Sequence, residues 1–241
     1  METLLNINLN YIVLFLIAIY IMQGFHKGAL ISFANTVGMV VSWLVGYLFS
    51  PLLSKSVSEG SFYRFLLYFT EGSTKLQNPA DANLLVDSLS NSQIENIVGS
   101  ADFPSPFSSL VTENMDGRVF EPQGIHTVAE YMDATIANVV VNIFTFLIIY
   151  ILSRVIIALV MNTMNFASPL PVLKRLDSTI GAGIGVVRGI LGMFAFFMLV
   201  PVLLISMPTD IDIVSQIVNN SSFATFFYES NFLLNMITGV L

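Results

Sequence analysis

Four long apolar stretches, separated by polar segments, dominate the pattern along the chain. They cover residues 6–24, 29–53, 134–153 and 189–207. A helix needs about 20 mainly apolar residues to cross the hydrocarbon core of a bilayer, so each stretch is long enough. The pattern predicts an all-α integral membrane protein with four transmembrane helices, arranged as two helical hairpins of the same orientation.

The third apolar stretch continues beyond residue 153, as far as Ser168. A helix of that length would need an unusual tilt to stay within about 30 Å of hydrocarbon. We therefore expect it to leave the membrane near Arg154. Residues 155–168 would then form a cytoplasmic or interfacial extension that Pro169 and Pro171 bring to an end.

The polar segments divide the chain into four parts. These are the first hairpin (1–53), an acidic helical insertion (54–133), the second hairpin with its cytoplasmic connection (134–207) and an amphipathic tail (208–241). Within the insertion, the aromatic-rich residues 61–70 are typical of a segment at the membrane interface, and residues 84–98 have apolar positions near helical spacing. In the tail, Glu229 interrupts the apolar run, so a surface helix is favoured over a fifth span.

Composition excludes a soluble globule and charge predicts the topology. Only 10% of the 241 residues are charged, and the mean hydropathy is +0.78. Suppose that the span ends near Lys27, Arg154 and Arg188 face the cytoplasm. The cytoplasmic side then carries five basic residues and one acid, and the other side carries four basic residues and fifteen acids. Because basic residues are retained in the cytoplasm, we expect both termini and the insertion to be extracytoplasmic.

The residue types give little indication of a catalytic, cofactor-binding or metal site. The chain has no cysteine and two histidines. His126, Glu130 and Asp133 could gather on one helix face as a metal site, but exposed residues of this kind are more often simply solvated. We expect no catalytic residue, no cofactor, no metal and no nucleic-acid partner.

A short signature occurs twice, as Gly24-x-x-Lys27-Gly28 and as Gly185-x-x-Arg188-Gly189. Each copy stands before an apolar stretch, so we expect both to begin a return helix at the cytoplasmic face. Two hairpins of the same orientation would be related by a pseudo-two-fold axis, which predicts that Lys27 and Arg188 lie close together around a shared anion. The alternative is that both are ordinary topology anchors.

Small residues recur at helical spacing in two of the predicted spans. In the second span they are Ala34, Gly38, Ser42, Gly46 and Ser50, and in the fourth they are Gly181, Gly185, Gly189 and Gly192. Small residues let helices approach closely in lipid, so we expect the two seams to meet inside one subunit. An oligomer contact or a pore lining is the alternative.

Other polar residues in or near the spans have structural interpretations. Asp177 precedes Ser178 and Thr179 and is expected to cap the fourth helix. Asn35, Asn138 and Asn142 are expected to hydrogen-bond between helices, with a polar conduction path as the alternative. No acidic residue lies inside the four predicted spans, which argues against a proton- or ion-coupled transporter.

Three segments together resemble the CvpA family of colicin V production proteins. They are the first hairpin with Gly24-x-x-Lys27-Gly28, residues 173–189 (LKRLDSTIGAGIGVVRG) and the tail residues 222–234. The resemblance implies a multi-pass protein of the bacterial inner membrane that is needed for colicin V production or export and is linked to envelope homeostasis. It implies no catalytic residues, and the insertion at 54–133 is longer than in shorter family members.

These observations lead to one functional hypothesis and one alternative. The first is a non-enzymatic scaffold or accessory subunit that supports toxin production, toxin export or envelope homeostasis. The alternative is a small channel or exporter formed by oligomers. The expected partners are membrane lipids, further copies of the chain, and an envelope or secretion protein.

Overall fold

The computed structural model describes residues 9–58, 60–70, 72–163, 174–206 and 218–241. Within these residues all regular structure is helical, apart from one isolated β-bridge between Leu85 and Thr127. Three helical stretches are long and apolar enough to cross a membrane: Leu9–Ser58, Val128–Met161 and Leu176–Ser206. The all-α fold of membrane-protein type that the sequence predicts is confirmed at this level.

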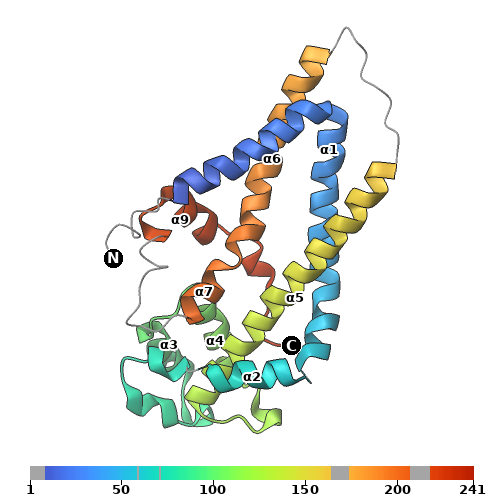
Figure 1. Ribbon diagram of the computed structural model, residues 1–241. Coiled ribbons are helices and arrows are strands. Elements are labelled where there is room, and N and C mark those ends of the chain that lie inside the picture. Colours follow the sequence, from blue (N-terminus) through green and yellow to red (C-terminus); the bar gives the residue numbers. More distant parts are fainter. Residues whose placement is uncertain (1–8, 59, 71, 164–173, 207–217) are drawn as a thin grey trace. The chain divides into compact units, whose positions relative to one another are not determined.

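The α-helices are named as in Figure 1. They are α1 (Leu9–Ser58), α2 (Ser61–Phe69), α3 (Asn91–Ser100), α4 (Phe107–Asp116), α5 (Val128–Thr163), α6 (Lys174–Phe197), α7 (Val200–Ser206) and α9 (Ser222–Glu229). Short 3-10 helices connect some of them: η1 (Gly72–Lys75), η2 (Pro79–Asn83), η3 (Val86–Ser88), η4 (Glu121–Gln123) and η6 (Leu234–Met236).

The chain folds into two compact units, and both α1 and α5 contribute to each. Unit 1 comprises residues 1–50, 146–197 and 215–231. Unit 2 comprises residues 51–145, 198–214 and 232–241. The segments that build one unit are therefore far apart in the sequence.

Helix α1 consists of two helical segments that meet at Gly28. The backbone of Gly28 has φ 77° and ψ 175°, which is incompatible with a continuing α-helix. Figure 1 shows the bend between the dark-blue and light-blue parts of α1. We call residues 9–27 the first segment and residues 29–58 the second segment. They correspond to the first two apolar stretches of the sequence.

Helix α5 begins at Val128, six residues earlier than the apolar pattern predicts, because two side chains cap it. The Glu130 carboxylate accepts hydrogen bonds from the backbone N–H groups of His126 and Thr127 at 3.0 and 2.9 Å. The Thr127 hydroxyl in turn accepts from the Glu130 N–H at 3.3 Å, which completes a capping box.

At its other end, α5 passes through Arg154 without interruption and runs to Thr163. Residues 155–163, which were expected to form an extension outside the membrane, are thus part of α5 itself. The expected stop at Pro169 and Pro171 lies outside the described residues.

Helix α6 begins well before the apolar stretch at 189–207. It runs from Lys174 to Phe197 and a separate α7 follows, so Arg188 lies inside a helix rather than at its start. Glycine disfavours an exposed helix by about 1 kcal/mol relative to alanine, yet α6 continues through its glycines. Their contacts with α1, described below, explain why a helix forms there.

Unit 2 holds its own hydrophobic core, built mainly from the insertion. Its buried members include Leu76, Val86, Ile94, Val98, Val111, Met115, Phe120, Val128 and Tyr131. The helix expected over 84–98 is only half right, since α3 starts at Asn91 behind a capping box made by Ser90 and Gln93. Leu85 lies outside that helix, where its backbone pairs with Thr127 in the isolated bridge, and its side chain is exposed.

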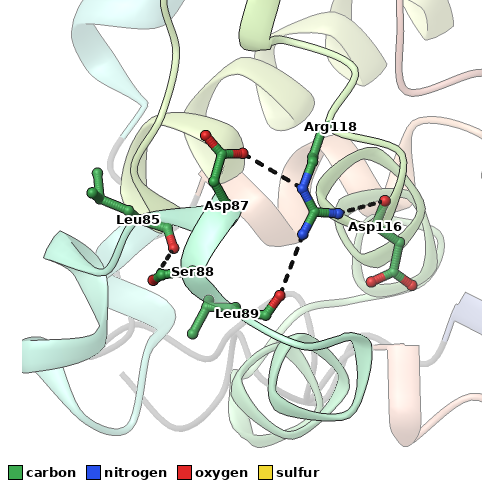
Figure 2. A network of polar contacts seen from close by, with 6 residues as sticks. All are labelled: Leu85, Asp87, Ser88, Leu89, Asp116 and Arg118. Carbon is green, nitrogen blue, oxygen red and sulfur yellow. Dashed lines mark hydrogen bonds and ion pairs between the residues drawn. The ribbon is translucent and has the colours of Figure 1, made fainter.

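Arg118 joins two parts of the insertion within unit 2, as Figure 2 shows. Its Nε lies 3.5 Å from the Asp87 carboxylate, and its two terminal nitrogens donate to the backbone oxygens of Leu89 and Asp116 at 3.3 and 3.1 Å. Both ionic side chains are partly exposed, so the ion pair itself stabilises the fold by less than about 1 kcal/mol. The backbone contacts fix the turn after α4 against η3.

Asparagines on α5 hold the end of the chain inside unit 2. Asn142 Nδ2 donates to the carbonyls of Thr238 and Val240 at 2.8 and 2.9 Å, and Asn138 Nδ2 donates to Gly239 O at 3.2 Å. The partners are backbone groups of the tail rather than another long helix.

Tyr63 on α2 completes this arrangement. Its hydroxyl donates to Asn138 Oδ1 at 2.7 Å, so both ends of that amide are used. Burial raises the pKa of the Tyr63 phenol above its ordinary value, which keeps the donating proton in place.

The part of the tail that belongs to unit 1 packs on α6. Phe227 of α9 lies 5.2 Å from Phe194 and 5.8 Å from Phe197, measured between ring centroids. The N–H of Phe223 donates to Asn10 Oδ1 at 2.8 Å, which ties α9 to the start of α1. The amphipathic tail thus has an inner aromatic face, while its position at the membrane stays a prediction.

Candidate functional site

The first segment of α1 crosses α6 in unit 1 with backbone against backbone. A methyl group built on Gly181 would lie 2.7 Å from the Gly28 carbonyl carbon, and one built on Gly185 would lie 3.0 Å from Ile21 Cα. Gly24 meets Gly181 and Gly185 at the same crossing, with no room for a side chain. The glycines expected to form a packing seam therefore lie where the backbones of two helices are in direct contact.

The contacts run in opposite chain directions. Ile17 lies against Gly189, Ile21 against Gly185, and Gly28 against Asp177. The first segment and α6 are therefore antiparallel at this crossing. No side chain longer than hydrogen fits at the central glycines without separating the backbones.

The second segment of α1 carries the other predicted seam, and its partner is α5. Gly38 faces Ile157 and Arg154, and Gly46 faces the ring of Phe146. The expectation that the two seams meet each other is wrong: each seam packs against a different helix. The reason is that Gly24 and Gly28 supply the small residues opposite α6.

Asp177 caps a helix, but not the one that the sequence indicates. It lies in the first turn of α6 rather than at its N-cap, and its Oδ1 accepts a hydrogen bond from the backbone N–H of Ala29 at 2.9 Å. Ala29 opens the second segment of α1, whose first N–H groups have no partner within their own helix. The carboxylate of α6 thus supplies an N-cap to a helix 148 residues earlier in the chain.

Gly28 makes this capping contact possible. A side chain at position 28 would collide with the Asp177 carboxylate, and the positive φ disfavours any residue with a Cβ. The bend at Gly28 and the capping contact of Asp177 therefore both depend on a glycine at this position.

Arg188 lies inside the same crossing and is only 2% exposed. Its Nη2 donates to Gln23 Oε1 at 2.8 Å, and its guanidinium carbon lies 5.0 Å from the centroid of the Tyr20 ring. The latter is a cation–π contact, which attracts a desolvated guanidinium to an aromatic face. The Nε of Arg188 is buried and has no hydrogen-bond partner among the described residues.

Arg154 approaches from α5. Its Nη1 donates to the backbone oxygen of Asn35 at 3.3 Å, and its guanidinium lies beside Gly38. Arg154 and Arg188 are near enough for their like charges to interact. Tyr150, one helical turn before Arg154, interacts electrostatically with Arg154 and with Tyr20.

The two copies of the doubled signature occupy different environments. Gly24, Lys27 and Gly28 lie at the bend of α1, where Lys27 is exposed. The second copy lies within continuous helix, with Arg188 buried. The expectation that both copies begin a return helix is therefore wrong for the second, although a shared ligand of Lys27 and Arg188 stays a prediction.

Sequence reasoning missed Tyr20 and Gln23 and treated Arg154 only as a topology marker. Gln23 could have been noticed as an amide one turn before Lys27 within an apolar stretch, at the spacing that places polar groups on one helix face. Nothing in the sequence shows that this face meets Arg188, because the two residues are 165 positions apart.

The described residues contain no group of three His, Asp or Glu side chains that could hold a metal ion. Of the three residues considered for a metal site, Glu130 and Asp133 form hydrogen bonds with backbone groups instead. Glu130 caps α5, and Asp133 Oδ1 accepts from the Gly72 N–H at 2.6 Å.

The three long apolar helices and their close glycine packing define an all-α chain of the membrane-protein class. Residues 119–231, which include α5, α6 and α9, match the family model described as Colicin V production protein. The match confirms the family resemblance seen in the sequence, while the bend of α1 with its first signature lies outside the matched residues. No curated protein and no solved structure gives a significant match to the chain.

Proposed function

We propose that this chain is a non-enzymatic component of the bacterial inner membrane that supports production or export of a colicin V-type toxin, or envelope homeostasis, as a scaffold or accessory subunit. The family match supports the link with toxin production. The observation that carries the accessory role is that polar side chains of the described long helices form hydrogen bonds within the chain. Asn138 and Asn142 both bond within the chain.

Other polar residues on the second segment of α1 follow the same rule. The Asn35 amide donates to Ile31 O at 2.8 Å, and the Ser42 hydroxyl donates to Gly38 O at 2.8 Å. A conduction path needs polar groups that remain available to a passing solute. Helices whose amides and hydroxyls are bonded internally suit a packing role better.

In the proposed topology four spans form two hairpins. The bend at Gly28 supports two spans within α1, and α5 and α6 with α7 supply the others. The acidic insertion and both termini face the periplasm, because basic residues favour the cytoplasmic side. In this arrangement the insertion is the part that an envelope or secretion partner reaches, and apolar side chains on α1 and α5 face lipid or a second copy of the chain.

The proposal is tested by two measurements on one set of variants. A strain without the chain is complemented with the wild type or with Gly185→Leu, and secreted toxin and resistance to envelope stress are measured. We expect the wild type to restore both and the variant to fail, since its helix crossing cannot close. If deletion changes neither phenotype, the proposed role is wrong.

The alternative role, an oligomeric channel or small exporter, is tested with the purified chain in liposomes. The accessory role predicts no solute flux above that of empty liposomes. Flux through the chain alone, lost in the Gly185→Leu variant, would replace the accessory role with a conduit.

A further inference from the structure

Two arginines of unit 1, Arg154 and Arg188, lie on two long apolar helices and both contact polar groups of α1. Arg188 contacts Tyr20 and Gln23 on the first segment, and Arg154 contacts Asn35 on the second. We propose that the two guanidinium groups form a binding site for a phosphate group, carried by an anionic phospholipid or by a phosphate-bearing solute.

The charges of the cluster are not balanced by protein. A guanidinium does not lose its proton in a protein, so both arginines remain cations even when desolvated. Among the residues that the structure describes, no carboxylate forms an ion pair with Arg154 or Arg188. The acid on α6, Asp177, is bonded to Ala29 and lies eleven residues from Arg188, a separation of about 16 Å along the helix.

Neutral groups compensate the two cations only in part. Arg188 receives one amide oxygen and one aromatic face, and Arg154 receives one backbone oxygen. Cations within apolar helices are costly unless paired, and two near each other also repel. An anion between them would turn that repulsion into two attractions.

The donor geometry favours a phosphate. Arg188 keeps a buried Nε–H without a partner, beside an Nη2 that is held in place by Gln23. A guanidinium presents its N–H groups as a planar fork, which suits the oxygens of phosphate. Arg154 comes from a different helix, so in the proposed site the two residues contact different oxygens of one tetrahedral group.

The setting indicates where the phosphate comes from. Both arginines belong to helices that are apolar enough to cross a membrane, and apolar side chains of α5 beside Arg154, such as Val155 and Ile156, are exposed. A phospholipid headgroup is the phosphate nearest to such a surface. A soluble phosphate would instead arrive from water, so the two sources are separable by experiment.

The test uses the full chain purified in a zwitterionic detergent. Thermal unfolding is followed after adding phosphatidylglycerol, phosphatidylcholine or inorganic phosphate, and retained lipid is counted by native mass spectrometry. We expect phosphatidylglycerol to raise the unfolding temperature and to remain bound. A rise with inorganic phosphate alone would assign the site to a soluble phosphate compound.

The variants are Arg188→Gln, Arg154→Gln and Arg188→Lys, with Lys27→Gln as the control because Lys27 is an exposed cation of the same unit. Loss of a charge-assisted contact should weaken phosphate binding at least about tenfold in the two glutamine variants. The lysine variant should bind with intermediate affinity, since it keeps the charge and loses the fork.

Two outcomes would overturn the site. One is that neither probe stabilises the wild type, and the other is that Lys27→Gln weakens binding as much as Arg188→Gln does. Since binding is measured on the purified chain, these results are independent of whether the chain supports toxin export.

Discussion

The carboxylate of Asp177 accepts a hydrogen bond from the backbone N–H of Ala29 at 2.9 Å, so one helix caps the beginning of another. This contact stands at the bend where α1 changes direction. It joins the two long helices at the point where the chain has lost its own helical hydrogen bonds. The stability of the bend should therefore depend on a residue of α6.

Replacing Asp177 by alanine should lower the free energy of unfolding by about 1 kcal/mol, because the N-terminal N–H groups of the second segment lose their acceptor. Thermal unfolding in detergent measures the change. Asp177→Asn keeps an acceptor oxygen and should retain most of the stability. Equal unfolding temperatures for the wild type and Asp177→Ala would contradict the capping role.

A second variant distinguishes capping from general packing. Gly28→Ala should destabilise the protein by more than about 1 kcal/mol, since position 28 has a positive φ and faces the Asp177 carboxylate. In the Asp177→Ala background the collision is removed, so the effect of Gly28→Ala should be smaller. Additive effects of the two substitutions would show that the residues do not interact.

The glycine crossing predicts a position-dependent effect of one small change. Gly185→Ala should lower stability by about 1 to 3 kcal/mol, because the added methyl group meets the backbone of Tyr20 and Ile21. Gly183 lies on the same helix and has open space where a Cβ would be placed. Gly183→Ala should therefore be neutral or slightly stabilising, since alanine favours a helix.

The comparison is made by unfolding in detergent and by size-exclusion chromatography. If Gly185→Ala keeps wild-type stability and instead loses self-association, the seam belongs to an oligomer. If Gly183→Ala destabilises as much as Gly185→Ala, the close contact with α1 does not explain the effect.

Asn142 should hold the C-terminal residues in unit 2. Asn142→Ala removes the hydrogen bonds from its amide to the carbonyls of Thr238 and Val240, which should cost about 1 to 3 kcal/mol and expose the end of the chain. Digestion by a carboxypeptidase, followed by mass spectrometry, should be faster in the variant. Asn83→Ala is the matched control because Asn83 is exposed, and a faster digestion there too would point to a general loss of stability.

The topology can be tested without removing native thiols, because the chain has no cysteine. Ser92→Cys and Leu241→Cys should react with a membrane-impermeant maleimide in intact cells, since both positions are predicted to be periplasmic. Lys27→Cys should react only after the inner membrane is opened. Labelling in the reverse pattern would invert the orientation.

The sequence alone determined the class of the protein and the location of its close helix contacts. Apolar length is a local property, and it marked the segments that became α1, α5 and α6. The spacing of Gly181 and Gly185 likewise predicted a smooth helix face, because residues four apart lie on one side of a helix. The resemblance to the colicin V production proteins was also carried by local residues.

Only the tertiary structure decided which faces meet and which charges are paired. The seam of α6 packs on Gly24 rather than on Gly38, Asp177 caps Ala29, and Arg188 bonds to Gln23. Each relation joins residues more than thirty positions apart, and such contacts depend on how helices cross. Hydropathy and spacing describe one helix at a time, so they specify a face and leave its partner open.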